Sequence, residues 1–343
     1  MSYGKAMPRL ARGEHLDRDE AESLMTELLE GALEPVQTAA VLTALALKGE
    51  SEGEIAGFAV AMRARAINVQ VDGTSVDTCG TGGSGLPTLN TSTMAAFVLA
   101  ADGVRVAKHG NRASSGKCGS MDVLERLGVN VELTPEQAQQ LVGHSPIVFL
   151  NARKHHPALG PIAPVRKALG FRTVFNLLGP ICNPAAARRQ LLGVSNARYG
   201  AVLARSLRTL GSERALVVAG ADGLDELSLH GPSRTWLLDE TGAIAEQTLE
   251  PKHANLSCAR LDEVLGGDVA HNAEVFVGIL QGRVDGAPLH HTALNAGAAL
   301  WVAGRVDGLA QGVARASEIL ASGAAHDALV RYRDLSRSIG TAA

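Results

Sequence analysis

Apolar residues recur every three to four positions through the first 65 residues, which predicts short amphipathic helices. A first helix is capped by Asp17 and ends at Gly31, and a second covers residues 35–47. Ser51 and Glu54 form a capping-box pattern before a third helix. The first helix carries an apolar stripe of Leu24, Met25, Leu28 and Leu29. Such stripes must pack on one another or on a partner, so we expect a helical domain.

From about residue 70 the pattern changes to short apolar runs that alternate with helical segments. Strands are expected at residues 75–79, 104–107, 146–150 and 214–220, and helices at 91–103, 120–128, 200–211, 295–304 and 309–323. This alternation indicates a mainly parallel sheet covered by helices on both faces. We therefore expect an α/β protein, with a small helical N-terminal domain over 1–68 and a larger α/β domain over 69–343.

Composition narrows the class of protein. The chain of 343 residues is 46% hydrophobic, which suffices for a sizeable core, and its net charge is only -3. Because no block of like charges occurs, binding to nucleic acid or to a membrane surface is not expected. We also expect no signal peptide and no transmembrane helix. Cys79, Cys118, Cys182 and Cys258 form no C-x-x-C pair, and we interpret them as reduced thiols of a cytoplasmic protein.

A glycine-rich stretch, SVDTCGTGGSG at residues 75–85, is the first candidate site. Gly80, Gly82 and Gly85 match the G-x-G-x-x-G fingerprint of dinucleotide-binding proteins. In that motif the helix begins inside the glycines, but here Pro87 follows and the helical pattern starts only near residue 90. Asp102 has nearly the spacing of the ribose-binding acid, yet it precedes the next strand instead of ending it. The context therefore argues against NAD.

The same stretch is typical of a phosphate-binding loop. Glycines let backbone N–H groups approach a phosphate, and the following helix offers its N-terminus. Ser92 and Thr93 add hydroxyl groups, and the next strand brings Lys108 to the same edge of the sheet. An ordinary turn followed by a helix cap remains the alternative.

Five segments, taken in order, carry a family likeness: DTCGTGGSG, LNTST, KHGNR, GFRTVFNLLGPICNP and ADGLDELS. They resemble the motifs of the anthranilate phosphoribosyltransferase family, a tryptophan-pathway branch of the nucleoside-phosphorylase-like phosphoribosyltransferases. The likeness extends from the N-terminal helices to NAGAALWVAG at residues 295–304. Several long motifs in fixed order are far more specific than any one of them.

The resemblance implies both an architecture and a reaction. It implies an active site between the helical and α/β domains, with a helical contribution to the small domain from about residues 160–185. It also implies a homodimer joined through the helical domain. The implied reaction transfers phosphoribosyl from 5-phosphoribosyl 1-pyrophosphate (PRPP) to anthranilate, with Mg²⁺ as cofactor, and gives N-(5-phosphoribosyl)anthranilate and pyrophosphate.

The resemblance also assigns residues to three sets of contacts. The PRPP set is Gly80, Thr81, Gly82, Gly83, Ser84, Asn90, Ser92, Thr93, Lys108, Ser115, Gly116 and Cys118. The anthranilate set is Gly80, His109, Asn111, His156, Arg166 and Gly179. The metal set is Ser92, Asp225 and Glu226. No side chain is assigned as a catalytic acid, base or nucleophile.

The residue types suit these roles. Asp225 and Glu226 follow the strand at 214–220, and adjacent carboxylates suit Mg²⁺, although a solvated acidic loop is the alternative. The guanidinium of Arg166 can hold a carboxylate through two hydrogen bonds, and an exposed helix arginine is its alternative. His155 and His156 are adjacent and so rarely face one ion, which argues against zinc.

Departures from the family pattern keep other functions open. Ser84 stands where Asp is usual, and Asn151 and Arg153 replace apolar or proline positions expected near the acceptor channel. A phosphoribosyltransferase with another aromatic acceptor is therefore one alternative. The others are a nucleoside phosphorylase and a non-catalytic nucleic-acid-binding relative, and the latter would be expected to be basic and to lack the donor and metal motifs.

Overall fold

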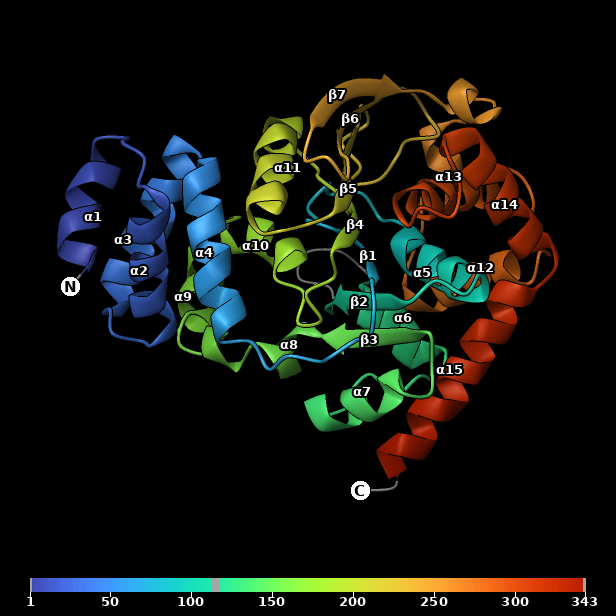
Figure 1. Ribbon diagram of the computed structural model, residues 1–343, viewed down its shortest axis with the longest axis horizontal. Helices are drawn as coiled ribbons and strands as arrows, with labels where there is room; N and C mark the ends of the chain where they lie inside the picture. Colours follow the sequence, from blue (N-terminus) through green and yellow to red (C-terminus); the bar gives the residue numbers. More distant parts are fainter. Residues whose placement is uncertain (1, 113–117, 342–343) are drawn as a thin grey trace.

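A seven-stranded sheet forms the centre of the larger part of the molecule (Figure 1). The computed structural model describes residues 2–112 and 118–341, so Ser115 and Gly116 of the expected PRPP set lie outside the described residues. Along the sheet the order is β3 (Ile147–Asn151), β2 (Val106–Gly110), β1 (Val76–Gly80), β4 (Arg189–Gly193), β5 (Arg214–Gly220), β6 (Ser233–Leu238) and β7 (Ile244–Leu249). The first five in this order are parallel, and β6 and β7 are antiparallel. The α/β fold with a mainly parallel sheet is thus confirmed.

The N-terminal segment is a helical bundle at one end of the molecule (Figure 1). Its helices are α1 (Ser2–Ala11), α2 (Arg18–Leu29), α3 (Pro35–Lys48) and α4 (Glu52–Ala64). The expected capping boxes are present, because Asp17 accepts from the Glu20 amide and Ser51 from the Glu54 amide. Two later helices pack on this bundle: α9 (Ala163–Leu169) contacts α3, and α10 (Phe175–Ile181) contacts α4. The domain boundary expected at residue 68 stays a prediction.

Alternate residues of the central strands feed two separate apolar cores. Leu191 and Leu216 belong to the core on one face of the sheet, whereas Leu192 and Val217 belong to the core on the other. The second core is continuous with the bundle and includes the α2 stripe Leu24, Met25, Leu28 and Leu29, each at most 4% exposed. That stripe is therefore part of the intramolecular core and is not a free surface for a partner.

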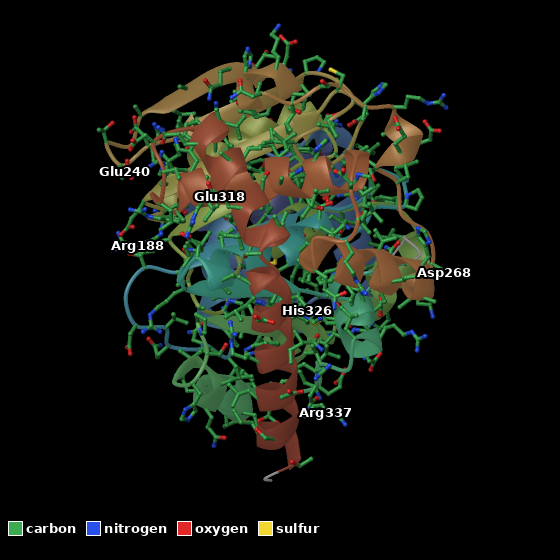
Figure 2. All side chains as sticks on the ribbon, turned by 90° about the vertical axis from the view of Figure 1, so that its right-hand side faces the viewer. Arg188, Glu240, Asp268, Glu318, His326 and Arg337 are labelled. Carbon is green, nitrogen blue, oxygen red and sulfur yellow. The ribbon has the colours of Figure 1, made fainter. Side chains whose placement is uncertain are left out.

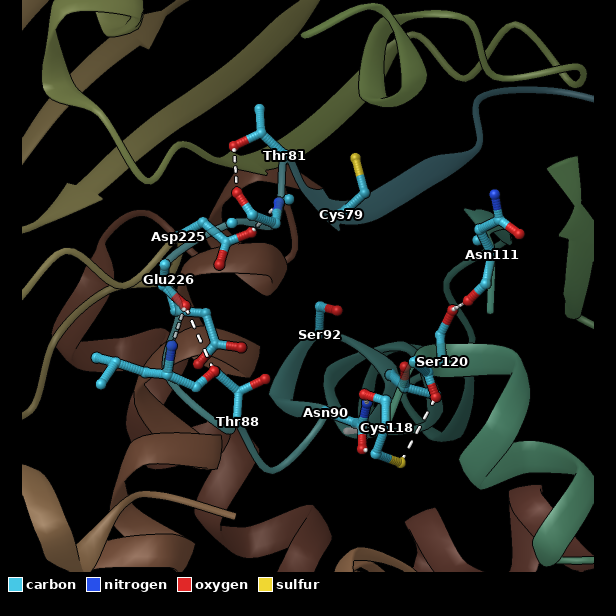
Figure 3. A pocket seen from close by; sticks show the side chains of 18 of the residues that line it. Cys79, Thr81, Thr88, Asn90, Ser92, Asn111, Cys118, Ser120, Asp225 and Glu226 are labelled. Carbon is cyan, nitrogen blue, oxygen red and sulfur yellow. Dashed lines mark hydrogen bonds between the residues drawn. The ribbon is translucent and has the colours of Figure 1, made fainter. Parts of the chain in front are cut away.

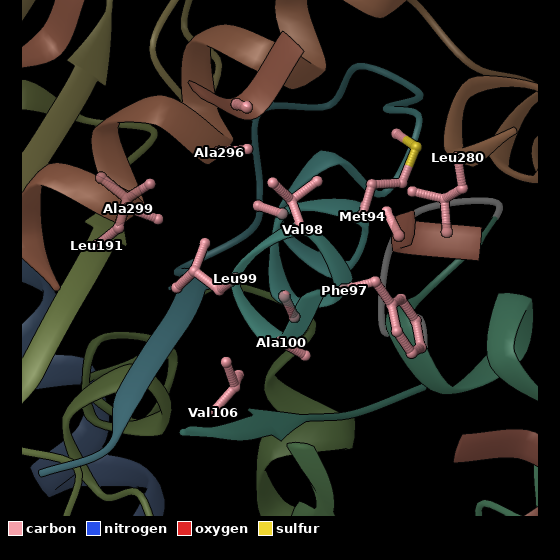
Figure 4. Packing of buried hydrophobic residues seen from close by; sticks show 14 of the residues in the cluster. Met94, Phe97, Val98, Leu99, Ala100, Val106, Leu191, Leu280, Ala296 and Ala299 are labelled. Atoms are coloured by element: carbon pink, nitrogen blue, oxygen red, sulfur yellow. The ribbon is translucent and has the colours of Figure 1, made fainter. Parts of the chain in front are cut away.

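Helix α5 (Thr91–Ala101) fills the first core because it is apolar on every side. Figure 4 shows Met94, Phe97, Val98, Leu99 and Ala100 projecting from it in several directions toward the surrounding elements. Its neighbours are β1, α13 (Ala287–Val302) and α15 (Ala324–Thr341). This rigid packing fixes the N-terminus of α5, which adjoins the glycine-rich stretch, against the sheet.

The remaining helices cover the edges and faces of the sheet. They are α6 (Ser120–Arg126), α7 (Pro135–Val142), α8 (Ala152–His155), α11 (Gly200–Thr209), α12 (Val269–Leu280) and α14 (Leu309–Ala321). Figure 2 shows α15, with His326 and Arg337, running down the side of the molecule toward the C-terminus. Among the described helices, none combines the length and the apolarity that a membrane span requires.

Candidate active site

The candidate site is a cavity of about 290 Å³ at the carboxyl ends of β1 and β2, where ligands of parallel sheets bind. Residues of all three expected sets line it, from segments far apart in the sequence: Gly80, Thr81, Gly82, Gly83, Ser84, Asn90, Ser92, Thr93, Lys108, His109, Asn111, Cys118, Asp225 and Glu226. Figure 3 shows Asp225 and Glu226 on one side of it, Asn111 and Ser120 on the other, and Ser92 between them.

The glycine-rich stretch is held in an open loop by bonds from three directions. Gly82 and Gly83 have φ of 62° and 85°, values that favour glycine. The amide of Thr81 donates to Gly193 O at 2.9 Å, and the Ser195 hydroxyl donates to Gly82 O at 2.9 Å. The Gly82 amide donates to Asp225 Oδ2 at 2.7 Å. The loop therefore lies directly against the carboxylate of Asp225.

At the start of α5, Asn90 is held by hydrogen bonds to two neighbouring segments. Asn90 adopts a left-handed conformation with φ 58° and does not cap the helix with its side chain. Its amide nitrogen instead donates to Cys118 O at 3.1 Å, and its oxygen accepts from Asn272 Nδ2 at 3.0 Å. Asn90 thus joins α5 to α12 and to the segment before α6. The buried Thr93 hydroxyl finds no partner among the described residues.

Lys108 reaches the cavity from within β2, not from the strand end. It is only 2% exposed, and its Nζ donates to Thr78 O and, at 3.2 Å, to Ser92 Oγ. Burial lowers the pKa of Lys108, and the Asp77 carboxylate opposes that effect. Asp77 is itself fully buried, and burial raises its pKa to about 6. It accepts from Asn183 Nδ2 at 2.7 Å, so its charge is held in a fixed network.

The acidic pair fits a magnesium ion. Burial raises the pKa of Asp225, and burial together with the charge of Asp225 raises that of Glu226 to about 8. Glu226 Oε2 is buried and has no hydrogen-bond partner among the described residues. An imidazole nitrogen lies 3.5 Å away, but this atom, His291 Nε2, donates to Leu227 O, and burial lowers the pKa of His291 to about 4. A carboxylate oxygen without a partner, beside a second carboxylate, suits a divalent cation.

The described residues contain no larger cluster of metal-ligating side chains. No group of three or more His, Cys, Asp or Glu side chains gathers there at metal-binding distances. Mg²⁺ needs fewer, because it keeps several waters and takes phosphate oxygens as ligands. Asp222 is a turn residue, since it accepts from the Leu224 amide at 3.0 Å and from the Ser228 hydroxyl.

The expected anthranilate residues divide into two groups. His109 and Asn111 line the cavity, whereas His156, Arg166 and Gly179 lie outside its wall. His109 Nδ1 contacts Gly179 O at 2.9 Å, and its ring lies 5.1 Å from that of His156 between centroids. Burial lowers the pKa of His109 to about 3 and that of His156 to about 4, so both rings are neutral. Each has a buried Nε2 with no partner among the described residues.

Arg166 carries a guanidinium without a carboxylate partner. It lies over the Phe175 ring, 5.0 Å from the centroid, and forms none of the ion pairs found among the described residues. Burial lowers its pKa. The alternative of an ordinary exposed helix arginine is therefore disfavoured, because a half-buried cation lacks a counter-charge here.

Asn151, Arg153 and Ser84 are residues that differ from the family pattern, and the structure shows where each of them lies. Asn151 is 4% exposed, donates to Val131 O at 3.1 Å and caps α8 through the Arg153 amide. The Arg153 side chain is exposed, and neither residue lines the cavity. The expectation that both border the acceptor is not supported by these positions. Ser84 does line the cavity, and its hydroxyl accepts from the Leu86 amide at 3.2 Å.

Sequence reasoning missed Arg172 and Asp77. Arg172 donates to Thr81 O at 2.9 Å and lies in the wall between the candidate site and a second cavity of about 300 Å³. Its only sequence signal was its place in the GFRTVFN segment. Asp77 was visible as a charged residue inside a strand otherwise expected to be buried.

The fold and the cavity together define a glycosyl transferase of two parts. Residues 5–66 match the model of the helical bundle domain of a glycosyl transferase family, and residues 72–326 match the model of its a/b domain. The chain belongs to this family. Within it, the matched relatives at 42–48% identity are anthranilate phosphoribosyltransferases, and the chain belongs with these phosphoribosyltransferases of tryptophan biosynthesis.

Individual relatives match over nearly the whole chain. The anthranilate phosphoribosyltransferase of Rubrobacter xylanophilus is 48% identical over 337 residues, which cover 98% of each chain. The crystal structure of the Thermus thermophilus enzyme has a TM-score of 0.90 at 42% identity and covers 97% of this chain and 99% of its own. The Saccharomyces cerevisiae enzyme, solved in complex with PRPP and Mg, has a TM-score of 0.89 at 25% identity and covers 98% of each chain.

Proposed function

We propose that this chain transfers phosphoribosyl from PRPP to anthranilate through the cavity described above, with Mg²⁺ bound by Asp225 and Glu226. The observation that carries the proposal is the convergence of a glycine loop, a buried lysine and a carboxylate pair in one cavity. A yeast relative has been solved with PRPP and Mg, which supports the same ligands here. The alternative of a nucleic-acid-binding relative is disfavoured by the net charge of -3 and by the presence of the glycine loop, Lys108 and the acidic pair.

On the donor side, the protein positions charge instead of forming covalent bonds. Departure of pyrophosphate leaves a ribose carbon with oxocarbenium character, and negative charge grows on the leaving group. The amides of the glycine loop, the N-terminus of α5 and Lys108 line the cavity and can donate to phosphate oxygens. Bound Mg²⁺ supplies neutralisation of the leaving group's charge. Asp225, Glu226 and Ser92 are the side chains that would hold it.

On the acceptor side, the chain offers a cation and neutral imidazoles. Arg166 can clamp the anthranilate carboxylate, because it has no counter-charge of its own. His109 directs Nδ1 at the Gly179 carbonyl, so that nitrogen carries the proton and Nε2 keeps its lone pair. Nε2 can then accept a hydrogen bond from the amine that attacks the ribose carbon. Asn111 lines the same cavity and adds a polar contact.

The test is a turnover assay with purified protein, PRPP, Mg²⁺ and a panel of aromatic amines that includes anthranilate. We expect anthranilate to be converted with release of one pyrophosphate per N-(5-phosphoribosyl)anthranilate formed. Turnover of another amine with none of anthranilate would contradict the acceptor and leave the transferase class standing. Phosphorolysis of a nucleoside without PRPP turnover would favour the phosphorylase alternative.

We also propose that the protein is a cytoplasmic homodimer joined through the helical bundle. The α2 stripe does not support this, because it is buried within the chain. Support comes from α3 instead, where Val36 and Leu47 are 75% and 84% exposed. These two side chains are exposed apolar surface on the bundle.

A further inference from the structure

The metal-site carboxylate occupies a hydrogen-bond donor of the glycine loop. Asp225 Oδ2 accepts from the Gly82 amide at 2.7 Å, and Figure 3 shows this carboxylate turned toward the loop. A Cβ on Gly80 would lie 2.1 Å from the same oxygen, and one on Gly193 would lie 1.6 Å from Asp225 O. The missing side chains at these two glycines are thus what lets Asp225 approach so closely.

The same amide is a donor that a phosphate would use. An uncomplexed diphosphate that approaches Gly82 meets a carboxylate on its hydrogen-bond donor, and the two anions repel each other in a partly buried site. A diphosphate that carries a divalent cation meets the opposite situation, since the cation attracts the carboxylate oxygen. A carboxylate at the position of Asp225 would therefore repel the metal-free form of this ligand and attract the metal-bound form.

We propose that Asp225 makes the donor site selective for metal-complexed diphosphates by occupying the Gly82 amide whenever the metal is absent. In the presence of a metal–diphosphate complex, Asp225 exchanges this hydrogen bond for the cation, and the Gly82 amide becomes free to donate to phosphate. The inference rests on the proposed function, because it takes the glycine loop as the diphosphate site. It gives Asp225 a specificity role in addition to that of a metal ligand.

Three variants separate the hydrogen bond from the charge. Asp225→Ala removes both the charge and the acceptor, whereas Asp225→Asn removes the charge and keeps an oxygen that can accept from Gly82. Glu226→Gln alters the neighbouring carboxylate, none of whose hydrogen bonds among the described residues reaches the glycine loop. Thermal unfolding of each variant checks that the fold is retained.

The measurement is calorimetric titration with inorganic pyrophosphate in excess EDTA. We expect Asp225→Ala to bind metal-free pyrophosphate about tenfold more tightly than Asp225→Asn and Glu226→Gln, because only the first variant frees the amide. With excess MgCl₂, wild type should gain affinity strongly and Asp225→Ala only weakly. Equal affinities of Asp225→Ala and Asp225→Asn without metal would overturn the proposal, since charge alone would then explain any gain.

Two further arms keep the outcomes distinct. Turnover of PRPP and anthranilate by wild type with Mg²⁺ is measured in parallel. If wild type is active but Asp225→Ala and Asp225→Asn bind metal-free pyrophosphate equally, only the Asp225 proposal is contradicted. Wild type that neither turns over PRPP nor binds magnesium pyrophosphate sinks the proposed function and this inference with it. If Asp225→Ala does not fold, hydrogen exchange at the Gly82 amide of wild type decides: exchange should accelerate when MgCl₂ alone is added, and unchanged exchange overturns the proposal.

Discussion

At the scale of single residues, we expect Arg166 and Lys108 to act on different substrates of the proposed reaction. Arg166 is expected to bind the acceptor and Lys108 the donor. Arg166→Ala should raise KM for anthranilate about ten- to a hundredfold and leave KM for PRPP nearly unchanged, because a charge-assisted bidentate contact is worth roughly 1.5–3 kcal/mol. Lys108→Ala should weaken use of PRPP instead, since Lys108 lies in the cavity wall with the glycine loop. Separate titration of each substrate measures both effects.

A matched control for Arg166 is Arg153→Ala. Arg153 is exposed on α8, whereas Arg166 is half-buried over the Phe175 ring, so loss of the Arg153 side chain should change neither constant. Equal losses for both substrates in Arg166→Ala would mean that this arginine supports the loop before α10 in general and does not clamp the acceptor.

A second residue-scale prediction concerns acid sensitivity. Burial lowers the pKa of His156 to about 4, below its ordinary value near 6.5, so this group contributes stability above pH 6.5 that is lost as pH falls through about 4. Between pH 7 and 5, His156 should account for a loss of about 2 kcal/mol in the free energy of unfolding. Urea unfolding at both pH values should show a smaller loss in His156→Gln by about that amount. An unchanged pH dependence in this variant would show that His156 titrates normally in the folded chain.

A site residue could be predicted from the sequence when its place in the chain alone brings it to the site, and not when its role depends on tertiary contacts. Residues in the loops that follow a strand, such as Gly82 and Asp225, were expected together because the carboxyl ends of parallel strands share one edge. Asp77 and Arg172 were not, since the role of Asp77 depends on burial beside Lys108 and that of Arg172 on a loop folding back onto Thr81. The bond between Gly82 and Asp225 joins residues 143 positions apart, and no local pattern indicates it.

At the scale of elements, helices α2, α3 and α4 and strands β1, β2, β3 and β5 were expected from the sequence. Helices α7 and α12 were not, although Thr134 and Asp268 cap them. The segment at 233–249 was not expected to form strands, because β6 and β7 pair antiparallel at the sheet edge and β7 has no fully buried residue. Strand β4 escaped notice because it begins at Arg189, whose side chain nevertheless donates to Ala303 O at 2.6 Å. Edge and mixed-polarity strands lack the apolar run on which such a prediction relies.

The capping box of α4 leads to a prediction about stability. Glu54 is fully buried, and besides capping it accepts from Lys48 Nζ at 2.6 Å, with the Lys48 side chain only 6% exposed. Lys48→Met should destabilise the protein by about 3 kcal/mol in urea unfolding, because it leaves a buried carboxylate without its cation. Arg12→Ala breaks an exposed pair with Glu14 and should cost less than about 1 kcal/mol. Similar small costs for both variants would show that Glu54 does not depend on Lys48.

At the scale of the whole molecule, the helical bundle and the sheet share one core. The apolar cluster that contains Leu24 of α2 also contains Leu192 of β4 and Trp236 of β6. Any motion between the two parts must therefore preserve this shared core, and the bundle cannot use its inner faces to bind a second chain. Among the exposed large apolar side chains of the described residues, Val36 and Leu47 of α3 are the most exposed, so α3 is the surface that we expect a partner to cover.

This surface yields a prediction about assembly. Wild type should be a dimer at micromolar concentration by light scattering, and the double variant Val36→Asp with Leu47→Asp should be a monomer, because it places charges in an apolar contact. Ile67→Asp is the control: Ile67 is 41% exposed but follows α4 instead of lying on α3, so the dimer should persist. The double variant should lose only the part of its free energy of unfolding that comes from subunit association. Packing within the chain should be unaffected, since neither side chain belongs to the intramolecular core. A monomeric wild type, or a double variant that remains dimeric, would contradict assembly through α3.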